Sequence, residues 1–395
     1  MFVAEIERHL QEKLIPFWAG LADREYGGFY GWMGDDLKVD RYAPKGVILN
    51  SRILWFFSSA YRMFGNPELL RYAEHAYRFL KDACLDRAYG GVYWSVTYDR
   101  KAADETKHTY NQAFAVYALS SYYRAGGDVQ ARKLAYDLFG LMESSCRDEG
   151  GYGEAYDRAF MPVENEKLSE NGVSAARTMN TLLHVMEAYT ELYQIDKDPL
   201  VGEKLRGILD VFLAHVYNPE KRRLEVFFDG NWQPLLDLHS YGHDIEASWL
   251  LDGTCRALGD TVYSEKLRPV IRNLAAECYQ TAYRGHSLLN ECENGIDNTD
   301  RIWWVQAESM VGFFNAWENE PEKQYYLDAV KDIWGYICGH LIDSRAGSEW
   351  YWRVDSLGNP VPGEPIVEPW KCPYHNGRMC MEIIERGKRY PKKLA

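Results

Sequence analysis

The chain has 395 residues, 46% of them hydrophobic and 26% charged, a globular composition that excludes a disordered or collagen-like chain. Its net charge of −13, without a long basic run, argues against nucleic acid, polyanionic substrates and anionic membranes as partners. Aromatic residues reach 14% and are rich in Tyr and Trp, which is typical of clefts that pack aromatic faces on sugar rings.

The beginning of the chain gives no sign of a targeting or membrane segment. Charges at Glu5, Glu7 and Arg8 interrupt the first residues, which lack the apolar core of a signal peptide. No stretch approaches the roughly 20 apolar residues of a membrane span. The eight cysteines form no Cys-x-x-Cys pair and are interpreted as buried residues in a reducing compartment. We therefore expect a cytoplasmic protein without membrane contact. A monomer is a separate expectation, which these features do not establish.

Apolar spacing predicts twelve helices along the chain. They cover residues 2–22, 46–64, 67–84, 108–125, 128–145, 175–194, 198–216, 240–258, 261–282, 302–318, 321–341 and 374–387. Glycine pairs followed by aromatic residues connect several of them, at Tyr26–Trp32, Tyr89–Trp94 and Gly150–Gly153, and predict tight turns into short strands. A unit of two helices and a Gly/aromatic connection thus recurs, which favours an array or a closed ring over separate domains.

Twelve helices in six pairs fit an all-α fold, the (α/α)6 barrel, with short Gly/aromatic β-hairpin connections. We expect one catalytic domain spanning residues 1–395. The barrel is preferred to an open solenoid because no atypical capping repeat is evident. It is also preferred because polar residues cluster on every second helix, the set that would line the inside.

These polar residues lie near the starts of every second predicted helix, where a buried face should be apolar. Asn180 and His184 are four residues apart and share a helix face, as do Trp304 and Glu308. A third stripe consists of His243, Glu246 and Trp249, at spacings of three. In a barrel the stripes meet at one end of the cavity. The resulting pocket would contain one arginine, three histidines and two glutamates, with a wall of Trp and Tyr; the charged and imidazole groups are Arg52, His184, His243, His375, Glu246 and Glu308.

A structural interpretation of the same residues stays open at this point. Arg52 could form an ion pair with Glu246 or Glu308, and the two glutamates could merely satisfy groups of the inner helices. Trp249 and Trp304 could belong to the core. By themselves the stripes predict a carbohydrate pocket that contains acid–base histidines.

The residue types restrict the chemistry of this pocket. His243 and Glu246 are three residues apart, but the other histidines lie far along the chain and an arginine is near, which is not a recognisable zinc pattern. We expect neither a metal nor a cofactor. A glycoside hydrolase is a rival, because Glu246 and Glu308 offer two carboxylates. Three imidazoles instead suit proton transfer near neutral pH.

Six segments have recognisable sequences. They are SRILWFFS (51–58), HTYNQAF (108–114), NTLLHVMEAY (180–189), GHDIEASWL (242–250), WWVQAE (303–308) and KCPYHNGRMC (371–380). In this order they closely resemble cellobiose 2-epimerases, which belong to the N-acylglucosamine 2-epimerase superfamily, and the matched blocks span residues 51 to 386. The last segment particularly resembles the disaccharide epimerases rather than the N-acylglucosamine enzymes, and no glycine-rich phosphate loop is present.

The resemblance implies an (α/α)6 barrel that reversibly epimerises C2 of the reducing-end glucose of β-1,4-linked disaccharides. Cellobiose would become glucosyl-mannose and lactose would become epilactose, without a metal or redox cofactor. The acid–base pair of the family falls on His243 and His375. The supporting positions fall on Arg52, Tyr110, Asn180, His184, Glu246, Trp249, Trp304, Glu308 and Trp370.

The expected reaction opens the sugar ring, removes the C2 proton, and returns a proton to the other face of a cis-enediol(ate). Arg52 and His184 are the catalytic candidates for stabilising charge on O1 and O2, with Tyr110 and Asn180 on neighbouring hydroxyls. Glu246 is expected to orient His243.

Glu308 is expected to hold a sugar hydroxyl or a catalytic histidine, and Trp304 and Trp370 to stack on the sugars. Which face of C2 each histidine serves stays open. The alternatives are an N-acylglucosamine 2-epimerase, a monosaccharide aldose–ketose isomerase, the glycoside hydrolase, and an inactive sugar-binding module.

Overall fold

The computed structural model describes residues 2–168, 171–391 and 393, and this part of the chain is mostly helical, as predicted. The predicted domain limits, residues 1 and 395, lie outside it. The helices are α1 (Phe2–His9), α2 (Ile15–Gly20), α3 (Val47–Phe64), α4 (Pro67–Phe79), α5 (Thr109–Gly126), α6 (Val129–Leu141), α7 (Met179–Asp196), α8 (Pro199–Val211), α9 (Tyr241–Leu258), α10 (Thr261–Thr281), α11 (Trp303–Asn319), α12 (Gln324–Tyr336) and α13 (His375–Gly387). Single π-helical turns follow α1, α4, α6, α8 and α12, and are η1 (Leu10–Leu14), η2 (Leu80–Cys84), η3 (Met142–Cys146), η4 (Phe212–Val216) and η5 (Ile337–Leu341).

With the π-helical turns included, each of the twelve predicted helices is confirmed within a few residues over the described part of the chain. A clear difference is the start of α7, predicted at residue 175 and found at Met179. The preceding Arg177–Thr178 is a strand, and the side chain of Thr178 accepts a hydrogen bond from the N–H of Thr181. This N-cap ends the extended segment and begins the helix.

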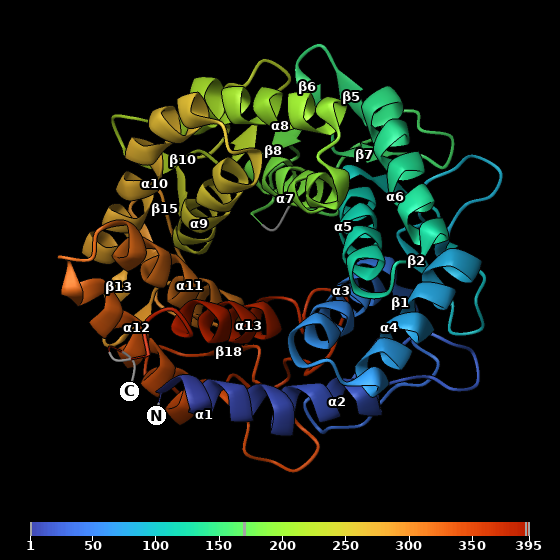
Figure 1. Cartoon of the computed structure of the whole chain (residues 1–395), viewed down its shortest axis with the longest axis horizontal. Helices are drawn as coiled ribbons and strands as arrows, with labels where there is room; N and C mark the ends of the chain where they lie inside the picture. The colour runs from blue at the N-terminus through green and yellow to red at the C-terminus, as the bar shows by residue number, and fades with distance from the viewer. Residues whose placement is uncertain (1, 169–170, 392, 394–395) are drawn as a thin grey trace.

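The helices form two concentric layers (Figure 1). The inner ring consists of α3, α5, α7, α9, α11 and α13, each in contact with the next, and α13 contacts α3. The outer layer consists of α1 with α2, α4, α6, α8, α10 and α12 (Figure 1). Helix α1 packs on α13, so the two ends of the described chain form one of the helix pairs.

The inner helices are more buried than the outer helices because they contact neighbours on more sides. Inner helix α3 contacts neighbours on several sides, and nearly every residue from Val47 to Ala60 is buried. Outer helix α4 buries one face only, at positions such as Leu69, Ala73 and Ala76. Where α11 crosses α9, Gly312 permits close contact, because a Cβ there would lie 2.6 Å from the carbonyl oxygen of Ile245.

Short strands join the repeats at one end of the ring. They are β1 (Lys45–Gly46), β2 (Ser95–Val96), β3 (Ala102–Asp104), β4 (Lys107–His108), β5 (Arg147–Asp148), β6 (Gly151–Tyr152), β7 (Ala155–Tyr156), β8 (Arg177–Thr178), β9 (Tyr217–Asn218), β10 (Arg223–Leu224), β11 (Phe227–Phe228), β12 (Leu238–Ser240), β13 (Tyr283–Arg284), β14 (Ser287–Leu288), β15 (Glu291–Glu293), β16 (Ile296–Asn298), β17 (Arg301–Ile302) and β18 (Arg353–Val354). The pairs β5–β6, β9–β10 and β13–β14 are local antiparallel hairpins. The strand before an inner helix instead pairs with the following repeat, as β4 does with β7 and β8 with β11. These pairings hold the starts of the inner helices together.

Some of the polar residues at the starts of the inner helices have a structural role. The fourth residue of α3, α5, α9 and α11 turns toward the neighbouring connection, where its side chain accepts a hydrogen bond from a backbone N–H. The bonds run from Phe29 to Asn50, Val92 to Gln112, Leu224 to Asp244 and Leu288 to Gln306. They satisfy buried backbone groups of the connections and fasten them to the ring.

Buried ion pairs fasten the same connections. Lys45 begins β1, and its Nζ lies 2.5 Å from Asp23 Oδ2 and 2.8 Å from the carbonyl oxygen of Gly27. Lys107 repeats the arrangement with Asp86 in the next repeat. Both side chains of each pair are buried, so each charge depends on its partner.

Replacing Lys45 by methionine is expected to lower the free energy of unfolding by about 3–5 kcal/mol, because it leaves the buried Asp23 carboxylate without a partner. Denaturant unfolding measures the change. Lys38→Met is the matched control, since Lys38 pairs with Asp36 in an exposed ion pair whose loss is expected to change stability by less than about 1 kcal/mol. Equal effects of the two substitutions would contradict this account of the buried pair.

Among the described helices, none combines the length and hydropathy that crossing a membrane requires. The expectations of a monomer and of a cytoplasmic location stay predictions.

Candidate active site

A cavity lies on the axis of the ring, at the starting ends of the inner helices. Nine of the eleven predicted site residues line it, namely Arg52, Tyr110, Asn180, His184, His243, Glu246, Trp304, Trp370 and His375. Sequence reasoning missed other lining residues, among them Ser240, Trp303 and Trp352. The described part of the chain thus brings together one arginine, three histidines and a wall of aromatic rings, as the stripes predict.

The helical repeat explains why these side chains meet. The second and sixth residues of an inner helix are separated by about one turn and face the same direction. In α7 these positions are Asn180 and His184, and both line the cavity. Arg52 and Glu246 are the sixth residues of α3 and α9, so side chains from different helices converge on one volume.

All three imidazoles of the cavity are held through Nδ1. Each hydrogen bond fixes the orientation of a ring and leaves Nε2 as the nitrogen available to a substrate. The anchors are Glu187 Oε2 for His184 at 2.9 Å, Ser240 Oγ for His243 at 2.7 Å, and Glu308 Oε1 for His375 at 2.7 Å. The arrangement suits acid–base chemistry at three points around one cavity.

The groups that hold His243 and His375 differ in charge, so the two imidazoles have different electrostatic surroundings. His243 rests on a neutral hydroxyl, while His375 rests on the carboxylate of Glu308 and has a second carboxylate, Glu246, 3.9 Å from Nδ1. A proton on His375 is therefore better stabilised by direct partners than a proton on His243. The expectation that Glu246 orients His243 is wrong for this structure, since Ser240 does so.

Burial governs the protonation of the histidines. Burial, together with nearby His184, lowers the pKa of His243 to about 3. Burial lowers the pKa of His375 well below its usual value, and the positive charges of Arg378 and Arg52 act in the same direction. Burial thus favours the neutral form of both imidazoles, which is the form that can accept a proton.

Glu246 is a buried carboxyl group on the cavity wall. Burial raises its pKa well above the usual value, and the neighbouring Glu308 adds to the effect. One of its oxygens, Oε2, has no hydrogen-bond partner among the described residues. Burial thus favours the protonated form of this carboxyl group, while its contact with Arg378 opposes that shift.

Arg52 forms neither of the ion pairs considered from the sequence. Its Nη2 donates a hydrogen bond to the hydroxyl of Tyr110 at 2.7 Å, and its guanidinium lies 4.2 Å from the ring centre of Phe114 and 4.6 Å from that of Tyr374. Aromatic faces and a phenol therefore surround the charge, which stays available to an anionic oxygen in the cavity.

Trp249 and Glu308 do not line this cavity, contrary to the predicted substrate contacts. From His243 to Trp249 the helix α9 advances about 9 Å, which moves the indole away from the inner helix starts. Trp249 lines a second cavity further along the inner helices and donates from Nε1 to Glu308 Oε2 at 3.0 Å. Glu308 lies behind His375 and holds it, which is one of its two predicted roles.

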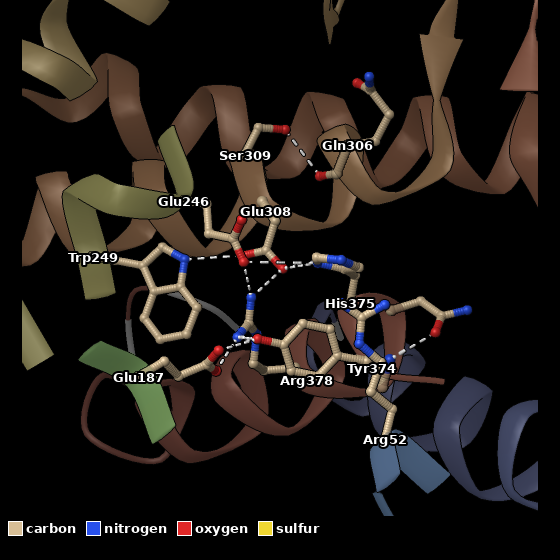
Figure 2. A network of polar contacts seen from close by, with 12 residues as sticks. Arg52, Glu187, Glu246, Trp249, Gln306, Glu308, Ser309, Tyr374, His375 and Arg378 are labelled. Atoms are coloured by element: carbon tan, nitrogen blue, oxygen red, sulfur yellow. Dashed lines mark hydrogen bonds and ion pairs between the residues drawn. The ribbon is translucent and has the colours of Figure 1, made fainter. Parts of the chain in front are cut away.

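Behind the cavity lies a network that sequence reasoning missed (Figure 2). Arg378 hydrogen-bonds to Glu187, Glu246 and Glu308, and Tyr374 donates to Glu187. The spacing of residues along the sequence could have indicated two members of this network, Glu187 and Arg378. Glu187 follows His184 by three residues, and Arg378 follows His375 by three, the same spacing that drew attention to His243 and Glu246.

The group Glu246, Glu308 and His375 has the composition and proximity of a metal site, with ligand atoms within 4.8 Å of one another. However, Nη2 of Arg378 donates to both carboxylates and already supplies the positive charge that a cation would bring. A second group, His239, Asp244 and Cys278, is also close together. There Asp244 accepts hydrogen bonds from His239 and from the backbone N–H of Leu224, so its carboxylate already has structural partners.

Comparison with known proteins places the chain in a family. Residues 28–376 match the family model of N-acylglucosamine 2-epimerase (GlcNAc 2-epimerase). The chain is 49% identical to a cellobiose 2-epimerase of Ruminococcus albus, over 98% of this chain and 99% of the relative. It is 48% identical to that of Eubacterium cellulosolvens, over 97% and 98%. The crystal structure of a sugar epimerase from a ruminal bacterium superposes with a TM-score of 0.97, at 48% identity, covering 98% of this chain and 99% of that one. The chain therefore belongs to the N-acylglucosamine 2-epimerase family.

Proposed function

We propose that this protein reversibly epimerises C2 of the reducing-end glucose of β-1,4-linked disaccharides, converting cellobiose to glucosyl-mannose and lactose to epilactose. The observation that carries the proposal is the set of three imidazoles, each anchored through Nδ1, around one cavity. The names of the relatives support cellobiose as substrate. We further infer that the two helical layers are an (α/α)6 barrel that acts as a single catalytic domain.

The chemistry explains the need for paired bases. The C2 hydrogen of a pyranose is not acidic until the ring opens and the C1 aldehyde can accept electrons. After ring opening, one base removes the proton and gives a planar cis-enediol(ate). A second group then delivers a proton to the opposite face, so that one residue acts as base and the other as acid.

His243 and His375 are the proposed acid–base pair. Both rings contact Trp304, with centroid separations of 4.8 Å and 5.4 Å, so they lie beside a common surface. Burial lowers the pKa of both imidazoles and favours the neutral form that acts as base. The pair must share one proton, so that one imidazole delivers it to C2 while the neutral imidazole takes up the C2 proton. Glu308 stabilises the imidazolium that forms on His375, and Ser240 orients His243.

Arg52 is the proposed donor to the oxygens at C1 and C2, where negative charge develops. His184 donates Nδ1–H to the Glu187 carboxylate, so it joins Arg52 as a donor when its Nε2 carries a proton. Preorganised donors at such positions stabilise the transition state more than the ground state. Tyr110 and Asn180 would bind neighbouring hydroxyls, and Oδ1 of Asn180, which has no partner within the described part of the chain, is an acceptor for one of them. Trp304 and Trp370 offer the faces on which sugar rings pack.

The hydrolase alternative in its predicted form, with Glu246 and Glu308 as the pair of carboxyl groups, finds less support in this geometry. Hydrolysis needs two carboxyl groups that flank the scissile bond. Glu308, one of the predicted pair, is engaged by His375, Trp249 and Arg378 and does not face the cavity.

Proton NMR of cellobiose incubated with the protein in D2O tests the proposal. A mannose-type reducing end that carries deuterium at C2 is the expected result, because the base exchanges its proton with solvent. Unchanged cellobiose would sink the disaccharide assignment. Conversion of N-acetylglucosamine would then indicate an N-acylglucosamine 2-epimerase, and conversion of mannose a monosaccharide isomerase. Release of glucose from cellobiose would indicate hydrolysis.

We expect the acid limb of the kcat/KM profile to lie below pH 6.5, the ordinary pKa of histidine. The histidine that acts as base must be neutral, and burial lowers the pKa of both, so the active form of the base persists to lower pH. Initial rates measured across the acid and neutral range, on protein shown to stay folded, check this. A limb at or above pH 6.5 would contradict it.

A further inference from the structure

Arg378 lies at the centre of the network behind the cavity (Figure 2). It is on α13, is only 2% exposed, and its guanidinium bonds to Glu187 of α7, Glu246 of α9 and Glu308 of α11. Its guanidinium carbon lies 4.7 Å from the ring centre of Trp249 and 4.1 Å from that of Tyr374. One side chain therefore joins four inner helices.

Two of these carboxylates each hold a histidine of the cavity. Glu187 Oε2 lies 2.9 Å from His184 Nδ1, and Glu308 Oε1 lies 2.7 Å from His375 Nδ1. Arg378 itself does not line the cavity that contains the histidines, but lines the second cavity on the other side of the network. Any effect of Arg378 on a substrate must therefore pass through its neighbours.

We propose that Arg378 is a positioning residue that couples His184 and His375 by fixing the orientation of Glu187 and Glu308, and that it limits how many protons this group of side chains holds. The proposal rests on the function proposed above. A planar guanidinium is suited to this task because its several N–H donors have a rigid geometry that can hold carboxylates in fixed directions.

The charges around His375 give the direction of the effect. The groups that face it are Glu308, Glu246, Glu187, His184, Arg52 and Arg378. Burial opposes ionisation of Glu187, but Arg378 and His184 hold its pKa at about 2, so it is a carboxylate. Without Arg378 the carboxylates face one positive charge fewer, and the Glu308–His375 pair binds a proton at higher pH.

Replacing Arg378 by glutamine tests the proposal. We expect kcat to fall by at least about 10-fold, KM to change by less than about threefold, and the acid limb of kcat/KM to move to higher pH. The matched control is Arg386→Gln on the same helix. Arg386 is 4% exposed and bonds to Glu318 and Glu382, away from the histidines. It is expected to lose stability without a shift of the pH profile.

A second variant separates charge from geometry. Arg378→Lys keeps the positive charge but lacks the planar fork, so we expect the acid limb to return toward the wild-type position while kcat stays low. It also serves if the glutamine variant does not fold. An Arg378→Gln profile that superimposes on the wild type after correction for folded protein would overturn the proposal, as would an equal pH shift in the Arg386→Gln control.

The inference can be tested apart from turnover. A ¹⁵N NMR titration of histidine side chains in folded wild type and Arg378→Gln is expected to show His375 binding a proton at higher pH in the variant. No shift there would refute the inference even if the enzyme epimerises cellobiose. A shift in a protein without activity on cellobiose would refute the proposed function and leave the role of Arg378 in place.

Discussion

The His375→Ala variant is expected to lose kcat for cellobiose epimerisation by a factor of about 10²–10⁴, the usual contribution of a positioned acid–base group. Its imidazole is held by Glu308 against Trp303 and Trp304. Glu308 keeps its hydrogen bond from Arg378 when the ring is removed, so no unpaired charge is left and the fold is expected to persist. Initial rates by NMR and thermal unfolding measure the two effects.

His286→Ala is the control for the loss of an imidazole, because His286 is exposed and pairs with Asp332 on the surface. It is expected to leave the rate unchanged. Wild-type activity in folded His375→Ala protein would remove His375 from the mechanism.

The second large effect concerns His243, whose replacement by alanine is expected to lower epimerisation by a similar factor. If the two histidines serve opposite faces of C2, each single variant retains a base for one face only. His243→Ala is then expected to exchange the C2 hydrogen of one sugar, cellobiose or glucosyl-mannose, with deuterium. His375→Ala is expected to exchange the C2 hydrogen of the other.

This pair of exchange measurements also assigns the face that each histidine serves. The two purified sugars are incubated separately with each variant in D2O, and loss of the C2 proton signal is followed by NMR. Exchange of both sugars by the same variant would contradict two bases on opposite faces and indicate a single base that reaches both.

The helices were predictable because each is long and has a clear apolar repeat, which the sequence displays without reference to any partner. Site positions on one turn of one helix were equally predictable. Asn180 and His184 share a face by helical geometry alone, and the structure places both in the cavity.

Predictions that extended along a helix were less successful. The stripe from His243 to Trp249 has a consistent angular spacing, but it advances along the axis, and only its first part reaches the cavity. Polar residues at helix starts also had two different uses that composition does not distinguish. Asn50 and Gln112 bind backbone groups of the connections, whereas Arg52 and Tyr110 face the cavity.

The sequence by itself thus determined the number and order of the helices, because these depend on local periodicity, and it indicated nine of the residues at the cavity. Only the tertiary structure decided what each charge touches. Glu187, Glu308 and Arg378 lie on three different inner helices, and their contacts arise from closure of the ring. The protonation of His243 and His375 follows from burial and neighbouring charge, which exist only once these helices have packed together.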